Sequence, residues 1–424
     1  MHLDQAQQGI DQAVAKLGDA SLSEQTIVEH LHPLFSRVLS RNKRTNEIYL
    51  SNHSLGRPLD MVSDVVQTAL DGWYDEIDGV WGYWLEARDR YRAQIARALR
   101  WPDENAVVPK SSAAQGLRAV LNALPSTCLK IVSTRCEFDS IDFVLKSYAH
   151  KGRAEMRWVE PDANDMLQAQ DIIDSIDEST DLVVVSMVCF VTGQRVEQIE
   201  RIIERAHACD AMVVLDAYHA FGVLPIDFGS LGADFIIAGN YKYTRGGAGS
   251  CFLAIHPRHL SPEGGVPPTD ALFPIDTGWF AKQDPFAYQR NEMPAFAAGG
   301  DAWLEATPPA LTYFQALPGL MLTNAIGVDR LRAYSLEQQK ALVDALAQHQ
   351  VSPRLFDQRG AYILIETPDG HEATKRLKEV GVNSDARPLP RSGSWVIRLC
   401  PDLLNTRAEL EDAANRVSSV LQRI

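Results

Sequence analysis

Short apolar runs alternate with segments of helical period through the middle of the chain. The four strand candidates are rich in β-branched residues and cover 129–135, 181–191, 211–218 and 233–240. The helix candidates between them carry apolar residues at helical spacing and cover 112–125, 140–152 and 195–210. Strands that alternate with amphipathic helices form parallel sheets with helices on both faces. The pattern therefore predicts an α/β fold with a mostly parallel central sheet.

The C-terminal part of the chain has a different pattern. Helical periodicity around 324–349 and 404–423 flanks two shorter strand-like runs at 361–367 and 395–400, which predicts a small α+β domain. We expect three parts: an N-terminal arm that belongs partly to the small domain (1–60), a large domain (61–320) and a small C-terminal domain (321–424).

Charge and hydropathy narrow the range of partners. The chain has 424 residues and a formal net charge of −14. Nucleic acids and anionic membranes bind to basic patches, and no run rich in Lys or Arg stands out, so we expect neither partner. No apolar run reaches the roughly 18 residues that span a membrane, and the N-terminus lacks the basic and apolar regions of a secretory signal. Small-molecule chemistry or a protein partner is the remaining expectation.

The six cysteines are scattered along the chain without CxxC or Cys/His spacing. Most lie in apolar surroundings, which is typical of small core residues and not of a disulfide framework or a zinc site. We therefore expect no metal site and a reducing, cytoplasmic location.

Polar residues directly follow two of the apolar runs. Asp216 ends one run, His219 comes three residues later, and Lys242 follows the next run in "GNYKYT". Taken alone, Asp216 fits a helix or turn cap and Lys242 fits a surface lysine. In an open parallel sheet, however, the carboxyl ends of the strands line the crevice where chemistry takes place. A carboxylate and a lysine there suit pyridoxal 5'-phosphate, which needs an anion at its ring nitrogen and a lysine at its aldehyde.

A phosphate site and a ring-stacking residue should accompany that pair. Ser111 and Ser112 lie where the run "AVVP" meets a predicted helix, so their hydroxyls and the free N–H groups of the first turn suit a phosphate. A Ser-Ser pair is equally typical of a helix N-cap. Phe138 follows the next strand, where it either stacks on the ring or packs in the core.

These residues lie in segments that resemble a known family. Residues 216–250, "DAYHAFGVLPIDFGSLGADFIIAGNYKYTRGGAGS", resemble the Schiff-base segment of kynureninases, which belong to the class V group of pyridoxal-phosphate enzymes with the aspartate-aminotransferase-like fold. Four further segments are similar to kynureninase motifs: "IYLSNHSLGRPL" (48–59), "FVTGQ" (190–194), "TGWF" (277–280) and "EATPPAL" (305–311). The resemblance covers roughly residues 45 to 424.

The resemblance implies a role for each matching residue at the cofactor. Lys242 forms the Schiff base, Asp216 binds the pyridinium nitrogen and His219 lies close to the ring. The other implied cofactor contacts are Ser111, Ser112 and Tyr241 at the phosphate, Phe138 on the ring face, and Ser186. From the second subunit of a homodimer with shared active sites, the resemblance implies that Trp279 and Thr307 reach the phosphate.

On the substrate side, the resemblance implies that Arg398 binds the α-carboxylate of an amino acid, a task that suits its bidentate fork. His53, Ser54 and Trp84 are implied to lie at or near the substrate. The implied activity is that of a kynureninase in tryptophan catabolism, which hydrolyses the Cβ–Cγ bond of kynurenine to give alanine and anthranilate.

The chain departs from the kynureninase pattern near the substrate. Ile141 stands where an aspartate is expected, His53 replaces the asparagine before Ser-Leu-Gly, and "PDLLN" replaces a Pro-Leu-Tyr stretch. The segment 74–90 carries Trp81, Tyr83 and Trp84 and no histidine. These changes leave a second hypothesis open, a class V aminotransferase or β-lyase in a specialised pathway.

Two other hypotheses have less support. A cysteine desulfurase needs a cysteine in a mobile loop after "TPPAL", and none is found there. A non-catalytic scaffold would not keep Lys242, Asp216, His219 and Arg398, because buried charges cost stability when their ligand is missing.

Overall fold

The computed structural model describes residues 1–101, 103–269, 271–287, 290 and 292–424. Its centre is a seven-stranded sheet in which β8 runs antiparallel to both of its neighbours and the other pairs are parallel. In spatial order the strands are β2 (Val107–Lys110), β8 (Cys251–Ile255), β7 (Phe235–Gly239), β6 (Met212–Asp216), β5 (Leu182–Ser186), β3 (Leu129–Thr134) and β4 (Ala154–Val159). The predicted α/β fold with a mostly parallel central sheet is confirmed.

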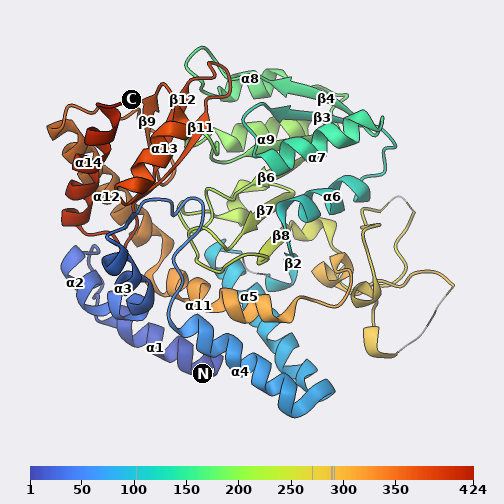
Figure 1. The fold of residues 1–424 in the computed structure, drawn as a ribbon. Helices are drawn as coiled ribbons and strands as arrows, with labels where there is room; N and C mark the ends of the chain where they lie inside the picture. Colours follow the sequence, from blue (N-terminus) through green and yellow to red (C-terminus); the bar gives the residue numbers. More distant parts are fainter. Residues whose placement is uncertain (102, 270, 288–289, 291) are drawn as a thin grey trace.

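Helices surround this sheet (Figure 1). Those that connect or flank its strands are α5 (Trp81–Ala98), α6 (Ala113–Ala123), α7 (Asp139–His150), α8 (Ala169–Asp174), α9 (Ile199–Ala208) and α10 (Phe228–Leu231). At one end of the molecule, α1 (Leu3–Ala15) and α4 (Met61–Glu76) pack against α11 (Ala310–Ile326). The short helices α2 (Glu24–His30) and α3 (Ser36–Thr45) lead into the segment before the first strand.

A second, smaller sheet lies in the C-terminal part. Its antiparallel order is β11 (Asp385–Pro388), β12 (Trp395–Leu399) and β9 (Ile363–Thr367). The helices here are α12 (Val328–Gln348), α13 (Gly370–Glu379) and α14 (Arg407–Leu421), and β1 (Ile48–Tyr49) pairs in parallel with β10 (Val382–Asn383). A separate hydrophobic core joins Ile48 and Leu50 to this part. The division at residues 60 and 320 stays a prediction.

The predicted elements are present, and two of them differ in extent. The run 181–191 forms a strand only as far as Ser186, after which the chain turns at Gly193 with φ +70°. A Cβ at Gly193 would lie 2.8 Å from the Tyr362 ring, so the turn and the close packing both require glycine. The helical pattern at 324–349 is divided between α11 and α12 by Gly327, whose φ is +90°.

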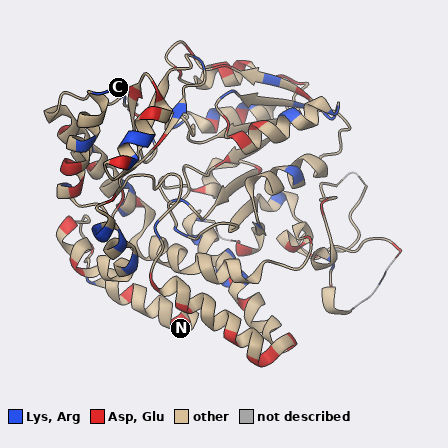
Figure 2. Cartoon of the chain, in the orientation of Figure 1, with Lys and Arg blue, Asp and Glu red and all other residues tan. Residues whose placement is uncertain are grey.

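Surface and core agree with the chain's composition. Figure 2 shows basic and acidic residues interspersed over most elements, with a group of Lys and Arg on α3. In the described ranges, no helix combines the length and apolar character that a membrane crossing requires. All six cysteines are free, and five of them are buried, as expected for core residues.

Candidate active site

The parallel strands bring three of the predicted residues to one edge of the sheet. Ser186 ends β5 and Asp216 ends β6, and the two residues are direct partners in the sheet register. Asp216 also pairs with Ile237 of β7, and Lys242 follows the end of that strand by three residues. This edge is the carboxyl end of the strands, where the fold predicts the site.

Lys242 is buried at this edge, not exposed as its local sequence alone suggested. Its Nζ lies 2.7 Å from His219 Nε2, and His219 Nδ1 lies 2.9 Å from the Tyr243 hydroxyl. Burial lowers the pKa of Lys242, and burial together with the lysine charge lowers the pKa of His219 well below its usual value. The Lys242 amine therefore loses its proton more readily than an ordinary lysine, and a neutral amine is the form that attacks a carbonyl.

Aromatic rings surround the lysine amine. The Nζ atom lies 5.5 Å from the ring centroid of Phe138, 5.5 Å from that of Tyr218 and 5.7 Å from that of Tyr241. Burial raises the pKa of Tyr241 to about 12, so its hydroxyl keeps its proton and can donate a hydrogen bond. Phe138 thus faces the site, where a flat ring would find an aromatic partner.

Asp216 is a buried acid with little compensation. The Tyr218 N–H donates to its Oδ1 over 2.8 Å, and no second donor to this carboxylate is present among the described residues. Burial raises the pKa of Asp216. A buried carboxylate of this kind is stabilised by a cationic ring N–H, so Asp216, the aromatic rings and the lysine amine together fit pyridoxal 5'-phosphate.

The serine pair lies at the start of α6. Ser112 caps the helix by accepting the Gln115 N–H over 3.1 Å, while the Ser111 hydroxyl donates to Gln115 Oε1 over 2.9 Å. The N-cap interpretation is therefore correct for Ser112, and phosphate binding by the pair stays a prediction. Gln115 in turn donates to Glu305 over 3.0 Å, which places the segment before Thr307 close to this helix start.

Trp279 and Thr307 lie beside each other. The Trp279 indole N–H donates to the Thr307 hydroxyl over 3.3 Å. In the described part of the chain, no contact joins either residue to Lys242 of the same subunit. This placement is compatible with the prediction that the two residues serve a second subunit.

Glu137 is a site residue that sequence reasoning missed. Its Oε2 accepts the Ser186 hydroxyl over 2.6 Å, and its Oε1 accepts the Thr134 hydroxyl over 2.7 Å. Burial raises the pKa of Glu137 to about 7. The missed signal is an acid directly before Phe138 at a strand end, the same pattern that identified Asp216.

Arg398 lies on the other side of the site in a buried cluster. Its Nε donates to Asp385 Oδ1 over 2.8 Å, and its Nη2 donates to Asp385 Oδ2. His53 Nε2 lies 2.7 Å from the same Oδ1. Sequence reasoning missed Asp385, although β11 and β12 place it directly opposite Arg398.

Tyr362 connects this cluster to the lysine side. Its ring centroid lies 5.6 Å from that of His219, 5.0 Å from that of His53 and 5.5 Å from Arg398 Cζ. The predicted residues His53, Arg398, His219 and Lys242 therefore line one continuous region.

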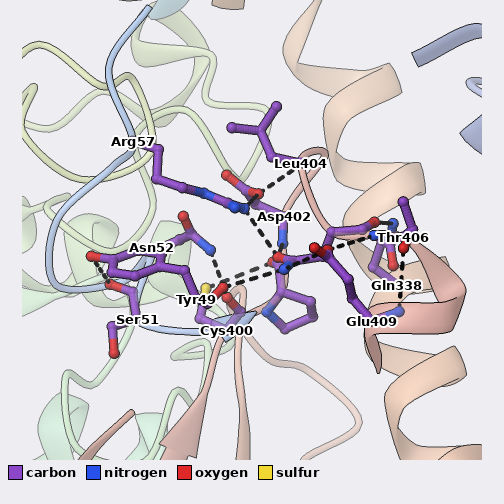
Figure 3. Close-up of polar contacts among 12 residues, drawn as sticks. Tyr49, Ser51, Asn52, Arg57, Gln338, Cys400, Asp402, Leu404, Thr406 and Glu409 are labelled. Atoms are coloured by element: carbon purple, nitrogen blue, oxygen red, sulfur yellow. Dashed lines mark hydrogen bonds and ion pairs between the residues drawn. The ribbon is translucent and has the colours of Figure 1, made fainter. Parts of the chain in front are cut away.

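The C-terminal stretch "PDLLN" anchors two loops at this region (Figure 3). Asp402 accepts hydrogen bonds from Arg57, which follows β1, and from Arg245 over 2.6 Å, three residues past Lys242. Asn52 donates to the Cys400 carbonyl over 2.8 Å. A Cβ at Gly56 would lie 2.0 Å from the Lys242 carbonyl oxygen, so glycine is required where the first loop crosses the lysine segment.

Two predicted substrate residues lie apart from these contacts. Ser54 is exposed, and its backbone N–H donates to the Ser51 carbonyl over 2.8 Å. Trp84 packs edge-on against Trp73 and Trp81, with ring centroids 5.6 Å apart in both pairs. Ile141, in the place of the expected aspartate, is fully buried. The substrate roles of Ser54 and Trp84 stay predictions.

The chain is similar to several known proteins. The model of the aminotransferase class-V family matches residues 83–265. A kynureninase of Geobacillus thermodenitrificans (strain NG80-2) is 26% identical over 391 residues, with 86% of each chain covered. A kynureninase of Pseudomonas fluorescens is 24% identical over 396 residues, with 89% of each chain covered.

Solved structures agree with the fold. A cystine C–S lyase in complex with cysteine persulfide has a TM-score of 0.77 at 19% identity and covers 88% of this chain and 97% of its own. The cysteine desulfurase of Thermococcus onnurineus NA1 has a TM-score of 0.75 at 17% identity, with coverages of 90% and 96%. At these identities the likeness shows the fold alone. The family match and the kynureninase relatives together support a kynureninase-like, pyridoxal-phosphate-dependent enzyme similar to the class V aminotransferases.

Proposed function

We propose that this enzyme is a hydrolase that cleaves the Cβ–Cγ bond of kynurenine or a related aromatic γ-keto amino acid, giving alanine and an anthranilate-type product. The observation that carries the proposal is the buried lysine amine, which interacts electrostatically with both Asp216 and Arg398. Relatives named kynureninase along most of the chain support the choice of reaction.

Each residue has a distinct task in this proposal. When bound, the cofactor supplies an aldehyde that joins to the lysine or the substrate amine and a ring that stores electrons released at Cα. Asp216 holds a proton on the ring nitrogen, and Lys242 Nζ, once released, takes the Cα proton. His219 Nε2 forms a hydrogen bond with that amine at 2.7 Å, which orients the amine. Phe138 covers one face and keeps water away from it.

The remaining residues bind and orient. The start of α6, with Ser111, Ser112 and Tyr241, holds the phosphate, since free N–H groups and the helix dipole favour an anion there. Ser186 contacts the ring side near Asp216. Arg398 holds the substrate's α-carboxylate, and His53 lies beside it. We further propose a homodimer in which Trp279 and Thr307 complete the phosphate site of the partner subunit.

Absorption spectroscopy tests the cofactor and its lysine. The purified protein is expected to be yellow after incubation with pyridoxal 5'-phosphate and to show the absorption band of lysine-bound cofactor. Lys242→Ala should lose this band, because no other amine can take its place at the end of β7. Lys340→Ala, a change at an exposed helix lysine, should leave it intact. Colourless protein, or an unchanged band in Lys242→Ala, would refute the cofactor site.

Product analysis tests the reaction. Incubation with kynurenine, 3-hydroxykynurenine and a panel of amino acids is expected to give alanine and an anthranilate without consumption of a keto acid. The fully buried Ile141 and the His53 replacement favour keeping one alternative, a class V aminotransferase or β-lyase. Keto-acid consumption would identify an aminotransferase, and release of the side chain with formation of pyruvate and ammonia would identify a β-lyase.

A further inference from the structure

The carboxylate-binding arginine already holds a carboxylate of its own chain. A guanidinium has a side edge, formed by Nε and one terminal nitrogen, and an end edge, formed by both terminal nitrogens. Asp385 occupies the side edge of Arg398 through two hydrogen bonds. The Nη1 atom donates to the Phe190 carbonyl, and the ring of Phe190 lies 5.9 Å from Cζ. The side edge is therefore occupied, and a substrate carboxylate would meet the terminal N–H groups that Asp385 and Phe190 leave free.

Asp385 is held firmly in this place. Its backbone pairs with that of Arg398 across β11 and β12, so the two residues share one register. His53, whose side chain has no exposed surface, binds Oδ1 at 2.7 Å, and Arg387 lies 3.5 Å from Oδ2. Burial alone would raise the pKa of Asp385, but His53 and Arg398 lower it well below its usual value. The acid is thus ionised, and rotation away from Arg398 would leave two buried donors without an acceptor.

The His53 ring has a single polar partner. Its Nδ1 is buried and has no hydrogen-bond partner among the described residues. An ionised Asp385 requires the proton on Nε2, so His53 acts as a neutral donor. Burial, aided by the Arg398 charge, lowers the pKa of His53 to about 4, which agrees with that form. Asn52, the residue before it, is fixed by its hydrogen bond to the Cys400 carbonyl (Figure 3).

We propose that Asp385 is a positioning residue that turns the end edge of Arg398 toward the substrate's α-carboxylate, and that His53 holds Asp385 in that role. This inference rests on the proposed function, in which Arg398 binds the substrate. A buried arginine without Asp385 would carry an uncompensated charge and could turn either edge to the site. With Asp385 in place, the guanidinium is neutralised and oriented before substrate arrives, so binding loses less conformational freedom.

The test compares two amines that differ by the carboxylate alone. Titration of the holoenzyme with L-alanine and with ethylamine, followed through the absorption of the lysine-bound cofactor, measures each affinity. In the unaltered enzyme, alanine should bind more tightly than ethylamine. Asp385→Asn should lower the affinity for alanine about tenfold or more, because an amide N–H then faces an arginine N–H. The affinity for ethylamine should change less than about twofold. Arg398→Ala should abolish the preference for alanine.

His53→Phe provides a second variant, because phenylalanine keeps the ring against Tyr362 and removes the bond to Asp385. This variant should also lower the affinity for alanine, by a smaller factor than Asp385→Asn, and leave the affinity for ethylamine unchanged. Tighter alanine binding in Asp385→Asn would show that Asp385 blocks the arginine. An equal loss of affinity for both amines would show a purely structural role. Either result overturns the inference. If alanine is preferred but kynurenine gives no anthranilate, the proposed reaction fails and the positioning role stands.

Discussion

Two buried carboxyl groups, Glu137 after β3 and Asp216 at the end of β6, lie on either side of β5, and their surroundings give them different tasks. Asp216 accepts one backbone N–H, so an oxygen remains for a cationic ring. Glu137 accepts the hydroxyls of Thr134 and Ser186 and the Ser186 N–H, and its hydrogen-bonding capacity is largely used within the protein. Because Ser186 is the sheet partner of Asp216, Glu137 holds in place the strand end beside the carboxylate that is proposed to bind the cofactor's ring nitrogen.

Glu137→Gln should change how stability depends on pH. The pKa of Glu137 is raised by burial from 4.5 to about 7, so the folded state holds a proton that the unfolded state releases between these values. The stabilisation of the folded state by this proton is complete below pH 4.5 and is lost as the pH rises to 7. The free energy of unfolding of the unaltered enzyme, relative to that of Glu137→Gln, should fall by about 3 kcal/mol across this window.

Urea unfolding of both proteins at pH 5 and pH 7.5 measures this difference. Glutamine has the shape of glutamate, keeps an acceptor for Ser186 and does not titrate. The pH dependence that the other ionisable groups contribute to stability is the same in both proteins and cancels in the comparison. A difference that stays constant with pH would mean that Glu137 is ionised throughout and that its hydrogen bonds outweigh its burial.

At the scale of elements, local pattern predicted β3, β5, β6 and β7 of the large sheet, but not β4 or β8, and it predicted the contacts between distant segments poorly. The strands that end at Ser186 and Asp216 were visible as β-branched runs, and a parallel sheet necessarily brings such ends together. Asp385 and Tyr362 were not predicted, because they reach the site only when the small sheet packs on the large one. No local signal records that packing. Glu137 was within reach, since it repeats the pattern of an acid after a buried strand.

Asp402 illustrates such a contact between distant segments. It joins the loop after β1, the segment after Lys242 and the end of β12 through Arg57 and Arg245, whose side chains are 4% and 8% exposed. Burial alone would raise the pKa of Asp402, but the two arginines hold it below its usual value. The replacement of the Pro-Leu-Tyr stretch by "PDLLN" thus places an anion between two buried cations.

Asp402→Asn should therefore destabilise the protein by about 3–5 kcal/mol, because it leaves two buried arginines without a charged partner. Denaturant unfolding of the holoenzyme measures the loss. Asp344→Asn is the matched control: its partner Lys340 is also a cation, but the two side chains are 58% and 73% exposed, so the change should stay within about 0.5 kcal/mol. Equal effects of the two substitutions would contradict an anchoring role for Asp402.

At the scale of the whole molecule, the described residues of 266–269, 271–287 and 292–293 extend to one side of the rest of the chain (Figure 1). It exposes large apolar side chains, including Val266, Ile275, Phe286 and Met293. Three aromatic residues of this segment, Trp279, Phe280 and Phe286, contact Trp81 of α5. Exposed apolar surface of this kind favours a protein interface. It supports the proposed homodimer, with Trp279 and Thr307 at the edge that a partner subunit would meet.

Mixing of inactive variants tests whether the subunits share sites. Suppose that each site takes Lys242 from one chain and Trp279 and Thr307 from the other. A mixed dimer of a Lys242→Ala chain and a Trp279→Ala/Thr307→Ala chain then contains one intact site. Equal amounts should then recover about a quarter of the unaltered activity, because half of the dimers are mixed and half of their sites are complete. Lys242→Ala mixed with Asp216→Ala should recover none, since these residues serve the same site from the same chain. Native mass spectrometry verifies the exchange, and verified mixed dimers that remain inactive in the first mixture would place Trp279 and Thr307 with Lys242 of their own subunit.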